Sequence, residues 1–243
     1  MKLVSHIVPI AELTQSQRVT MLGLMRQHYE DVREELFQHD LDEKDWVILL
    51  SDLSGVIRGF STQKLLNDEL AGKPIRVVFS GDTIVDREHW GDRALGHAWG
   101  NLALRLLEDD PAHALYWFLI SQGYRTYRFL PLFFQEYFPR SDRETPADMK
   151  SLIDGLALRR YGREYDPERG IVQPAAQYRL RAEFGAASEL RLHDPHVRFF
   201  VTANPRHAEG AELCCLAQIT RENFTSAAWR VIHTPRRGTL WCG

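Results

Sequence analysis

The segment 75–107 constrains the fold most strongly, because it joins a strand, a short polar turn and an amphipathic helix without interruption. Val77, Phe79, Thr83 and Val85 follow a period of two, and Gly81 interrupts the pattern as a β-bulge does. From Leu95 onward, apolar residues recur at spacings of three and four, which is typical of a helix facing a core. The sequence therefore predicts a bulged strand that leads into a helix.

The turn between this strand and this helix is rich in small residues, including Gly91, Ala94 and Gly96. The first N–H groups of a helix have no partner within the helix, and they lie at the positive end of its dipole. Such a position binds anions, most often phosphate. We therefore expect an anion site at this turn.

A bulged strand followed by this turn resembles the signature of the GNAT superfamily of acyl-CoA-dependent N-acyltransferases. In that family the motif R/Q-x-x-G-x-G/A holds the pyrophosphate of coenzyme A through backbone amides. The six matching positions here are Gly91, Asp92, Arg93, Ala94, Leu95 and Gly96. Gly91 stands where the family has Arg or Gln, and Ala94 stands where it has the first glycine. The resemblance covers about the first 140 residues, and the segment 55–60 fits the family pattern G-x-I-x-G-F.

Composition indicates one ordinary globular unit of 243 residues, of which 44% are hydrophobic and 26% charged. The net charge of −3 argues against a general nucleic-acid binder, which needs a basic surface. No apolar run is long enough to cross a bilayer, and the first residues do not resemble a secretory signal. We expect a cytoplasmic protein without nucleic-acid or membrane partners, and the sequence does not indicate its oligomeric state.

The predicted fold is a single mixed α/β domain, GNAT-like, with a central mixed sheet flanked by helices. Its core spans 1–140 and includes an antiparallel meander of three strands and a buried strand at 114–121 that runs parallel to its neighbour. A helical and loop-rich insertion follows at 141–195, with a helix capped by Thr145 and Pro146. The segments HVRFFVTANP and ELCCLAQIT predict a C-terminal β-hairpin at 196–220, before a tail at 221–243.

The resemblance also implies where chemistry occurs. The family's fourth and fifth strands splay apart, and the amides near Thr83, Ile84 and Val85 would pair with the pantetheine arm. Candidates for the general base on the strand and the following loop are Asp82, Asp86, Glu88 and His89. Phe133 occupies the position of the family's proton-donating Tyr, so Tyr124 or Tyr127 is the substitute candidate.

The implied function is acyl transfer from an acyl-thioester to the amine of a small molecule. The donor is acyl-CoA or an acyl-carrier protein, acyl-CoA being a co-substrate, and neither a permanently bound cofactor nor a metal is expected. One alternative is a GNAT-like module that binds acyl-thioesters without catalysis. Another is a metal-dependent enzyme built on histidines and carboxylates, namely His193, Asp194, His196, His207, Glu209 and Glu212, although H-E-x-x-H spacing is absent.

Three further groups have simpler interpretations. Arg159, Arg160 and Arg163 are either phosphate ligands or cations at the end of a helix, where they complement its dipole. His28 lies among polar neighbours and is interpreted as an exposed surface residue. The adjacent Cys214 and Cys215 are interpreted as buried strand residues, because no disulfide or thiol-metal spacing is present.

Overall fold

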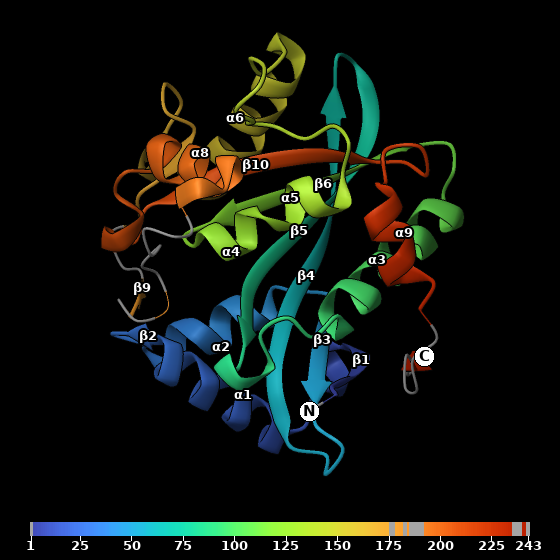
Figure 1. Cartoon of the computed structure of the whole chain (residues 1–243), viewed down its shortest axis with the longest axis vertical. Coiled ribbons are helices and arrows are strands. Elements are labelled where there is room, and N and C mark those ends of the chain that lie inside the picture. Colours follow the sequence, from blue (N-terminus) through green and yellow to red (C-terminus); the bar gives the residue numbers. More distant parts are fainter. Residues whose placement is uncertain (1, 175–177, 182–183, 185–191, 235–239, 242–243) are drawn as a thin grey trace.

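The computed structural model describes residues 2–174, 178–181, 184, 192–234 and 240–241. A nine-stranded mixed sheet with the order β11-β1-β3-β4-β5-β6-β10-β8-β7 runs through the molecule (Figure 1). Its long strands are β1 (Val4–Pro9), β3 (Trp46–Ser51), β4 (Ile57–Leu70), β5 (Lys73–Val85), β6 (Ala114–Ser121) and β10 (Glu212–Ile219). The two-residue strands β7 (Tyr165–Asp166), β8 (Ile171–Val172) and β11 (Leu240–Trp241) complete it. The predicted mixed sheet is confirmed.

The N-terminal third follows the local sequence signals closely. Helix α1 (Gln15–His28) begins at Thr14, which forms a capping box with Gln17, and α2 (Glu34–Asp42) follows the two-residue strand β2 (Tyr29–Glu30). The strands β3, β4 and β5 form the predicted antiparallel meander. Between β3 and β4, the Asp52 carboxylate accepts hydrogen bonds from the amides of Ser54 and Val56.

The strand-turn-helix prediction is confirmed in its main parts. After β5, the short 3₁₀ helix η2 (Arg87–His89) and a turn lead into α3 (Ala94–Asp109). The chain then returns in β6, which runs parallel to β5. Parallel neighbours need a crossover connection, which is usually a helix. Here α3 connects β5 to β6 and packs against one face of the sheet.

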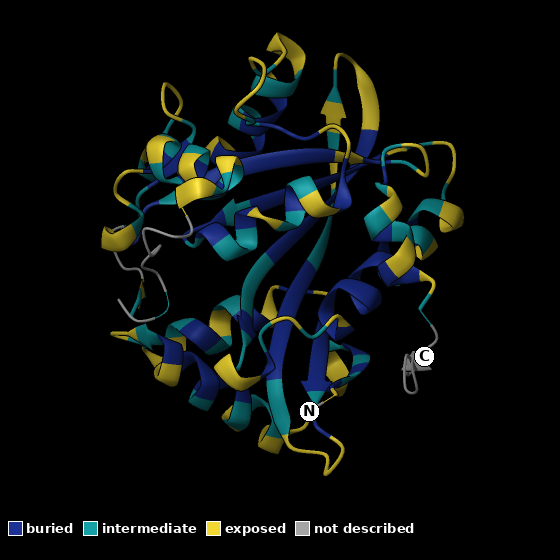
Figure 2. Ribbon diagram, viewed as in Figure 1, coloured by how far each residue is buried: buried dark blue, intermediate teal, exposed yellow. Residues whose placement is uncertain are grey.

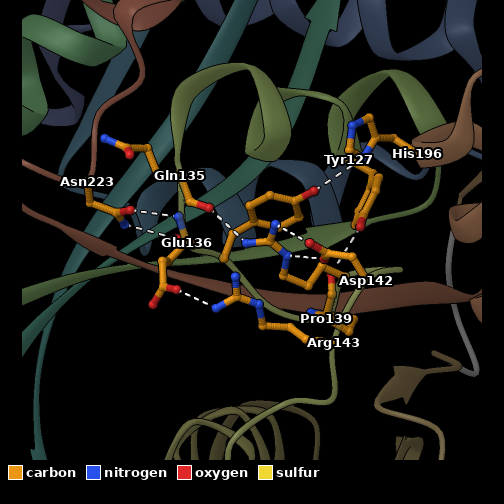
Figure 3. A network of polar contacts seen from close by, with 10 residues as sticks. Tyr127, Gln135, Glu136, Pro139, Asp142, Arg143, His196 and Asn223 are labelled. Carbon is orange, nitrogen blue, oxygen red and sulfur yellow. Dashed lines mark hydrogen bonds and ion pairs between the residues drawn. The ribbon is translucent and has the colours of Figure 1, made fainter.

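The aromatic segment after β6 splits into α4 (Tyr124–Tyr127) and α5 (Phe129–Phe133). Pro131 has no N–H to offer the carbonyl of Tyr127, so one continuous helix cannot form there. The extended chain that follows is held by the polar network of Figure 3, in which Asn223 binds both the amide and the carbonyl of Glu136. Arg140 lies 5.0 Å from the ring of Tyr137 and donates to Asp142.

The segment 141–195, predicted as an insertion, contributes to both the core and the sheet. Its helix α6 (Ala147–Tyr161) buries Leu152, Ile153 and Leu156 against β5, β6 and β10, and β8 pairs with β10. The predicted cap on α6 is wrong, because Pro146 occupies the N-cap position and no side chain caps the helix. The two-residue strand β9 (Arg179–Leu180) pairs with β2 outside the main sheet.

Of the two strands predicted for the C-terminal hairpin, the second is confirmed and the first is wrong. ELCCLAQIT forms β10, which pairs antiparallel with β6, but HVRFFVTANP lies in helix α8 (Pro195–Ala203). The Asp194 carboxylate accepts the amide of His196, and Pro195 occupies the first turn, so the start of a helix is specified locally. The tail contains α9 (Ser226–Ile232), which packs on α3, and β11 beside β1.

The core has one continuous layer on one face of the sheet and two separate clusters on the other (Figure 2 shows the buried central strands). The continuous layer lies under α3, α5, α8 and α9. On the opposite face, α1 and α2 cover the half with β1, β3 and β4, and α6 covers the half with β5, β6 and β10. Cys214 and Cys215 are buried in β10, as predicted, and Cys242 lies outside the described residues.

Candidate functional site

The site begins where β5 and β6 separate. The two strands pair in parallel from Ile75 and Ala114 as far as Ser80 and Leu119. Beyond that point β5 continues to pair with β4 up to Val85, whereas β6 continues beside β10. Among the residues that the structure describes, the second half of β5 therefore has a sheet neighbour on one edge only.

A β-bulge lies at the point of separation. Ser80 faces Gln63 and Thr83 faces Ser61, so Gly81 and Asp82 together oppose the single residue Thr62. A Cβ on Gly81 would approach Thr62 Oγ1 to 2.7 Å, which explains the glycine there. The bulge that the sequence predicts at Gly81 is confirmed.

The direction of the amides beyond the bulge follows from the ladder. Asp86 donates its N–H to the carbonyl of Arg58, and hydrogen-bonded pairs alternate along an antiparallel ladder. The amides of Thr83 and Val85 therefore turn away from β4, toward the edge that β6 has left. On the same edge, the Val85 carbonyl accepts the indole N–H of Trp90 at 2.9 Å.

The separated strands border a cavity of about 790 Å³. It reaches from the first turn of α3, through the gap beyond Ser80, to the space between α1, α2 and α6. Most of the predicted site residues line it: Asp82, Thr83, Ile84, Val85, His89, Gly91, Asp92, Arg93, Leu95 and Gly96. The cavity therefore brings the residues of β5 and of the turn after it together with residues from elements that are distant in the sequence.

Asp82 lies on the bulge, half-buried, with its side chain in the cavity lining. Burial raises the pKa of Asp82 to about 7. The nearby carboxylate of Asp40 adds to the rise, and Lys44 and Arg160 partly offset it. A carboxyl group with a pKa near neutrality is suited to accept a proton at physiological pH.

The charged groups around Asp82 come from three other elements. The Lys44 ammonium is buried and lies 2.6 Å from the Asp40 carboxylate, and its stem lies against the bulge at Gly81. Arg160, at the end of α6, lies 3.2 Å from Asp40 and 4.2 Å from the ring centroid of Phe79. Of the three arginines predicted at that helix end, Arg160 is the one that lines the cavity.

The first turn of α3 forms the other end of the cavity. Asp92 accepts the amide of Ala94 at 2.7 Å and that of Leu3 at 3.0 Å, so its carboxylate serves the backbone. The Ala94 amide, predicted to bind the anion, is thereby already used, and Ala94 does not line the cavity. Leu95 and Gly96 remain as cavity-lining residues of the first turn, where N–H groups have no acceptor within the helix.

Arginine side chains surround this end. Arg93 and Arg230 are exposed and line the cavity, and the guanidinium of Arg125 lies 3.8 Å from the ring centroid of Trp90. The cavity therefore has cations and helix amides at one end and carboxylates at the other. Gly96 also allows α3 to approach α5, because a Cβ there would lie 2.9 Å from Phe133 Cζ.

Three of the predicted catalytic residues are not in the cavity lining. Asp86 lies beside Arg58, at 3.9 Å, and Glu88 is exposed on η2. Tyr124 is buried, with the guanidinium of Arg125 4.9 Å from its ring centroid. Of the turn after β5, His89, Trp90 and Gly91 line the cavity, whereas Asp86 and Glu88 do not, and Tyr124 is buried at the start of α4.

Several lining residues had no signal in the sequence. Tyr29, Tyr161 and Tyr178 line the acidic end, and burial raises the pKa of each, that of Tyr178 to about 12. His28, interpreted as a surface residue, is in fact 6% exposed and also lines the cavity. None of these positions shares a motif with the bulged strand, because each comes from a different element.

The residues of the metal alternative are dispersed. Asp194 caps α8 and lies 3.0 Å from Arg128, whereas His207 lies against the ring of Phe200. Within the described part of the chain, no group of three or more His, Cys, Asp or Glu side chains could hold a metal ion. None of the helices described has the length and apolar character that a membrane crossing requires.

Comparisons with known proteins were made by sequence and by structure. No protein-family model matches the sequence, and a search of curated proteins finds no significant match. By structure, the chain is similar to a GNAT-family N-acetyltransferase from Escherichia coli in complex with CoA, with 16% identity and a TM-score of 0.37 over 50% of this chain and 65% of that one. A probable N-acyltransferase from Enterococcus faecalis has 11% identity and a TM-score of 0.41, over 89% of this chain and 66% of that one.

The glucosamine-6-phosphate N-acetyltransferase of Arabidopsis thaliana is a third similar structure, with 12% identity and a TM-score of 0.39, over 60% of this chain and 98% of that one. The chain thus spans slightly less than two thirds of the length of the first two proteins. At these identities and TM-scores, activity has to be argued from the site itself.

Proposed function

We propose that this chain transfers an acyl group from an acyl-CoA to an amine. One observation carries the proposal: a single cavity joins the first turn of α3 to a bulged strand whose outer edge has lost its neighbour. Unpaired strand amides suit an extended amide-bearing arm, and helix amides with nearby arginines suit its phosphates. Residues of both regions line the same cavity of about 790 Å³.

The chemistry needs a base, a donor for the developing oxyanion and a proton for the leaving group. Asp82 accepts the proton of the attacking amine, and a new C–N bond forms at the thioester carbonyl. An amide of the outer edge, from Thr83 or Val85, donates to the carbonyl oxygen as it becomes negative. When the C–S bond breaks, the thiolate takes up the proton that Asp82 accepted from the amine, and the carboxylate is restored.

A thiol-release assay tests the proposal. The protein is incubated with acetyl-, malonyl- or long-chain acyl-CoA and a panel of primary amines, and free CoA is measured over the rate without protein. We expect turnover with at least one pair of substrates. Thermal stabilisation by acyl-CoA without any turnover would instead identify a binding module, and absence of both would refute the proposal.

Charge reversal tests whether the arginine end of the cavity binds the phosphates of acyl-CoA. Arg93→Glu with Arg230→Glu should weaken acyl-CoA binding by tenfold or more, because both side chains lie at the phosphate end. Arg206→Glu is the matched control, since Arg206 is exposed and does not line the cavity. Binding of acyl-CoA that is unaffected by the double change would contradict the assignment of this end.

A further inference from the structure

Residues 178–181 and 184 cross from one side of the cavity to the other, and we call them the strap. Their strand β9 pairs with β2 on one side, and Figure 1 shows β9 between β2 and α4. Tyr178, Leu180 and Phe184 line the cavity, whereas Arg179 is exposed. The strap therefore presents alternate side chains of β9 to the cavity and to solvent.

The strap is joined to β2 through its backbone. Strand β9 pairs antiparallel with β2, and the Arg181 amide donates to the carbonyl of His28 at 2.9 Å. Because hydrogen-bonded pairs alternate along an antiparallel ladder, Leu180 turns its N–H toward the opposite edge of β9. The rings of Tyr178 and Tyr29 also meet on this side, with centroids 6.5 Å apart.

On the opposite edge, a side chain takes the place of a strand. The Gln122 carboxamide accepts the N–H of Leu180 at 3.1 Å and donates to the carbonyl oxygen of Tyr178 at 3.4 Å. Gln122 follows β6, is 5% exposed and lines the cavity. Arg125 on α4 donates to the carbonyl of Phe184 at 2.7 Å. These attachments are made by side chains, so they can open without breaking a backbone ladder.

The strap borders the place where we expect the acceptor. Burial raises the pKa of Tyr178 to about 12, and the negative charge of Asp82 adds to the rise, so the strap lies near the proposed base. The ring centroid of Phe184 lies 4.5 Å from that of His28 and 6.0 Å from that of Trp90. The strap thus connects α1 with the turn after β5 across the cavity.

We infer that the strap closes the acceptor side of the cavity and that Gln122 is a specificity-determining residue, which holds the strap in place so that compact amines are accepted and chain-like amines are not. This inference rests on the proposed function, which it deepens by naming what restricts the acceptor. A chain-like amine, such as the end of a polypeptide, extends beyond the cavity and has to pass the strap. The strap opens on the Gln122 side, where side chains hold it, and stays paired with β2.

Glycinamide and triglycinamide provide the test, because they share the reacting end and differ in length. With a fixed acyl-CoA, we expect kcat/KM of the wild type for glycinamide to exceed that for triglycinamide by about tenfold or more. Gln122→Leu removes both bonds to the strap at similar side-chain size and should lower this ratio by about threefold or more. Equal values for the two amines in the wild type, or a ratio that Gln122→Leu leaves unchanged, would overturn the inference while leaving acyl transfer established.

The matched control is Gln135→Leu. Gln135 is an exposed glutamine outside the cavity lining, and its side chain donates to the carbonyls of Glu222 and Phe224. Its replacement also removes two bonds from a side chain to the backbone of a distant segment, but it should retain the ratio. A ratio that falls equally in both variants would mean that general loosening of the fold, and not the strap, sets the preference, and would overturn the inference.

Hydrogen exchange tests the strap without turnover. In Gln122→Leu, protection of the Leu180 amide should fall by about tenfold or more, whereas that of the Arg181 amide, bonded to His28, should stay within about twofold. Gln122→Asn, whose side chain is shorter, gives the same readout if Gln122→Leu does not fold. Absence of turnover with any amine would count against the proposed function alone. The exchange data then decide: selective loss at Leu180 supports the strap, and equal loss at both amides, or none, overturns it.

Discussion

The two halves of β5 have opposite surroundings, although they belong to one strand. From Ile75 to Ser80 the strand is bonded to β4 on one edge and β6 on the other, and Val77 and Phe79 are at most 1% exposed. From Gly81 to Val85 it is bonded to β4 alone, and most of its residues are half-buried in the cavity wall. The first half is core and the second half is site.

The transition takes place within two residues because of the bulge. An extra residue between Ser80 and Thr83 alters the local twist, and β6 continues instead beside β10. A fully paired strand offers no free edge to a ligand, whereas a strand that has lost one neighbour offers its amides. The same residues that weaken the sheet here therefore create the proposed site.

The largest expected effect is on catalysis in the second half. Asp82→Asn removes the proposed base with little change in shape, so kcat should fall by about 10²- to 10⁴-fold. Acyl-CoA binding, measured by calorimetry, should remain within about twofold, because the carboxylate does not contact the phosphate end. A variant that retains more than half of the wild-type kcat would exclude Asp82 as the base.

Substitutions in the core around the first half of β5 should instead lower the stability of the protein. Leu119→Ala removes a side chain that is 1% exposed on β6, opposite Ser80, and should lower the free energy of unfolding by about 2–5 kcal/mol. Thr83→Ala loses a bond of 2.7 Å between Thr83 and Ser61 and should cost about 1 kcal/mol. Urea unfolding of the two variants measures the contrast, and equal losses would refute the division of β5.

The bulge itself should tolerate little added volume. In Gly81→Ala the new Cβ would approach Thr62 Oγ1 to 2.7 Å and Lys44 Cε to 2.9 Å, so we expect a loss of about 1–3 kcal/mol in unfolding free energy. Gly72→Ala at the β4–β5 tip controls for glycine replacement, since nothing lies within 4 Å of its Cβ, although its φ of +77° adds backbone strain. Unchanged stability of Gly81→Ala would mean that the bulge relaxes freely.

The smallest effect concerns pH. Because Asp82 acts as a base only when deprotonated, kcat/KM should rise with pH through about 7. Asp40→Asn removes a negative charge that raises the Asp82 pKa and releases Lys44 and Arg160, both of which lower it, so the ascending limb should move to lower pH. A limb that stays in place or moves upward in the pH-rate profile would contradict this electrostatic assignment.

Stability should respond to the same group in the opposite sense. A carboxyl whose folded-state pKa lies above its ordinary value favours folding at low pH, and this contribution is lost as the pH rises through about 7. The wild type should therefore lose Tm relative to Asp82→Asn between pH 5 and pH 8. If the Tm values of the two proteins change in parallel between pH 5 and pH 8, Asp82 is not desolvated in the folded protein.

Local patterns in the sequence determined the elements and their order. The alternation in β5, the glycine of its bulge, the capping box at Thr14 and the helical spacing in α3 each depend on residues within a few positions of one another. The same local evidence made Asp82 one of four candidate bases and predicted an anion site at the turn before α3. It was misleading for HVRFFVTANP, where β-branched and aromatic residues suggested a strand although Asp194 and Pro195 begin a helix.

Only the tertiary structure decided which residues share the cavity. His28, Arg160, Tyr178 and Glu212 come from α1, α6, the loop before β9 and the start of β10, and no spacing along the chain relates them. The helices α1, α2 and α6 cover one face of the sheet. The positions of these residues depend on where those helices end and on how far β6 separates from β5. Periodicity reports which side of an element is buried, whereas the meeting of side chains from different elements depends on long-range packing, which local patterns do not encode.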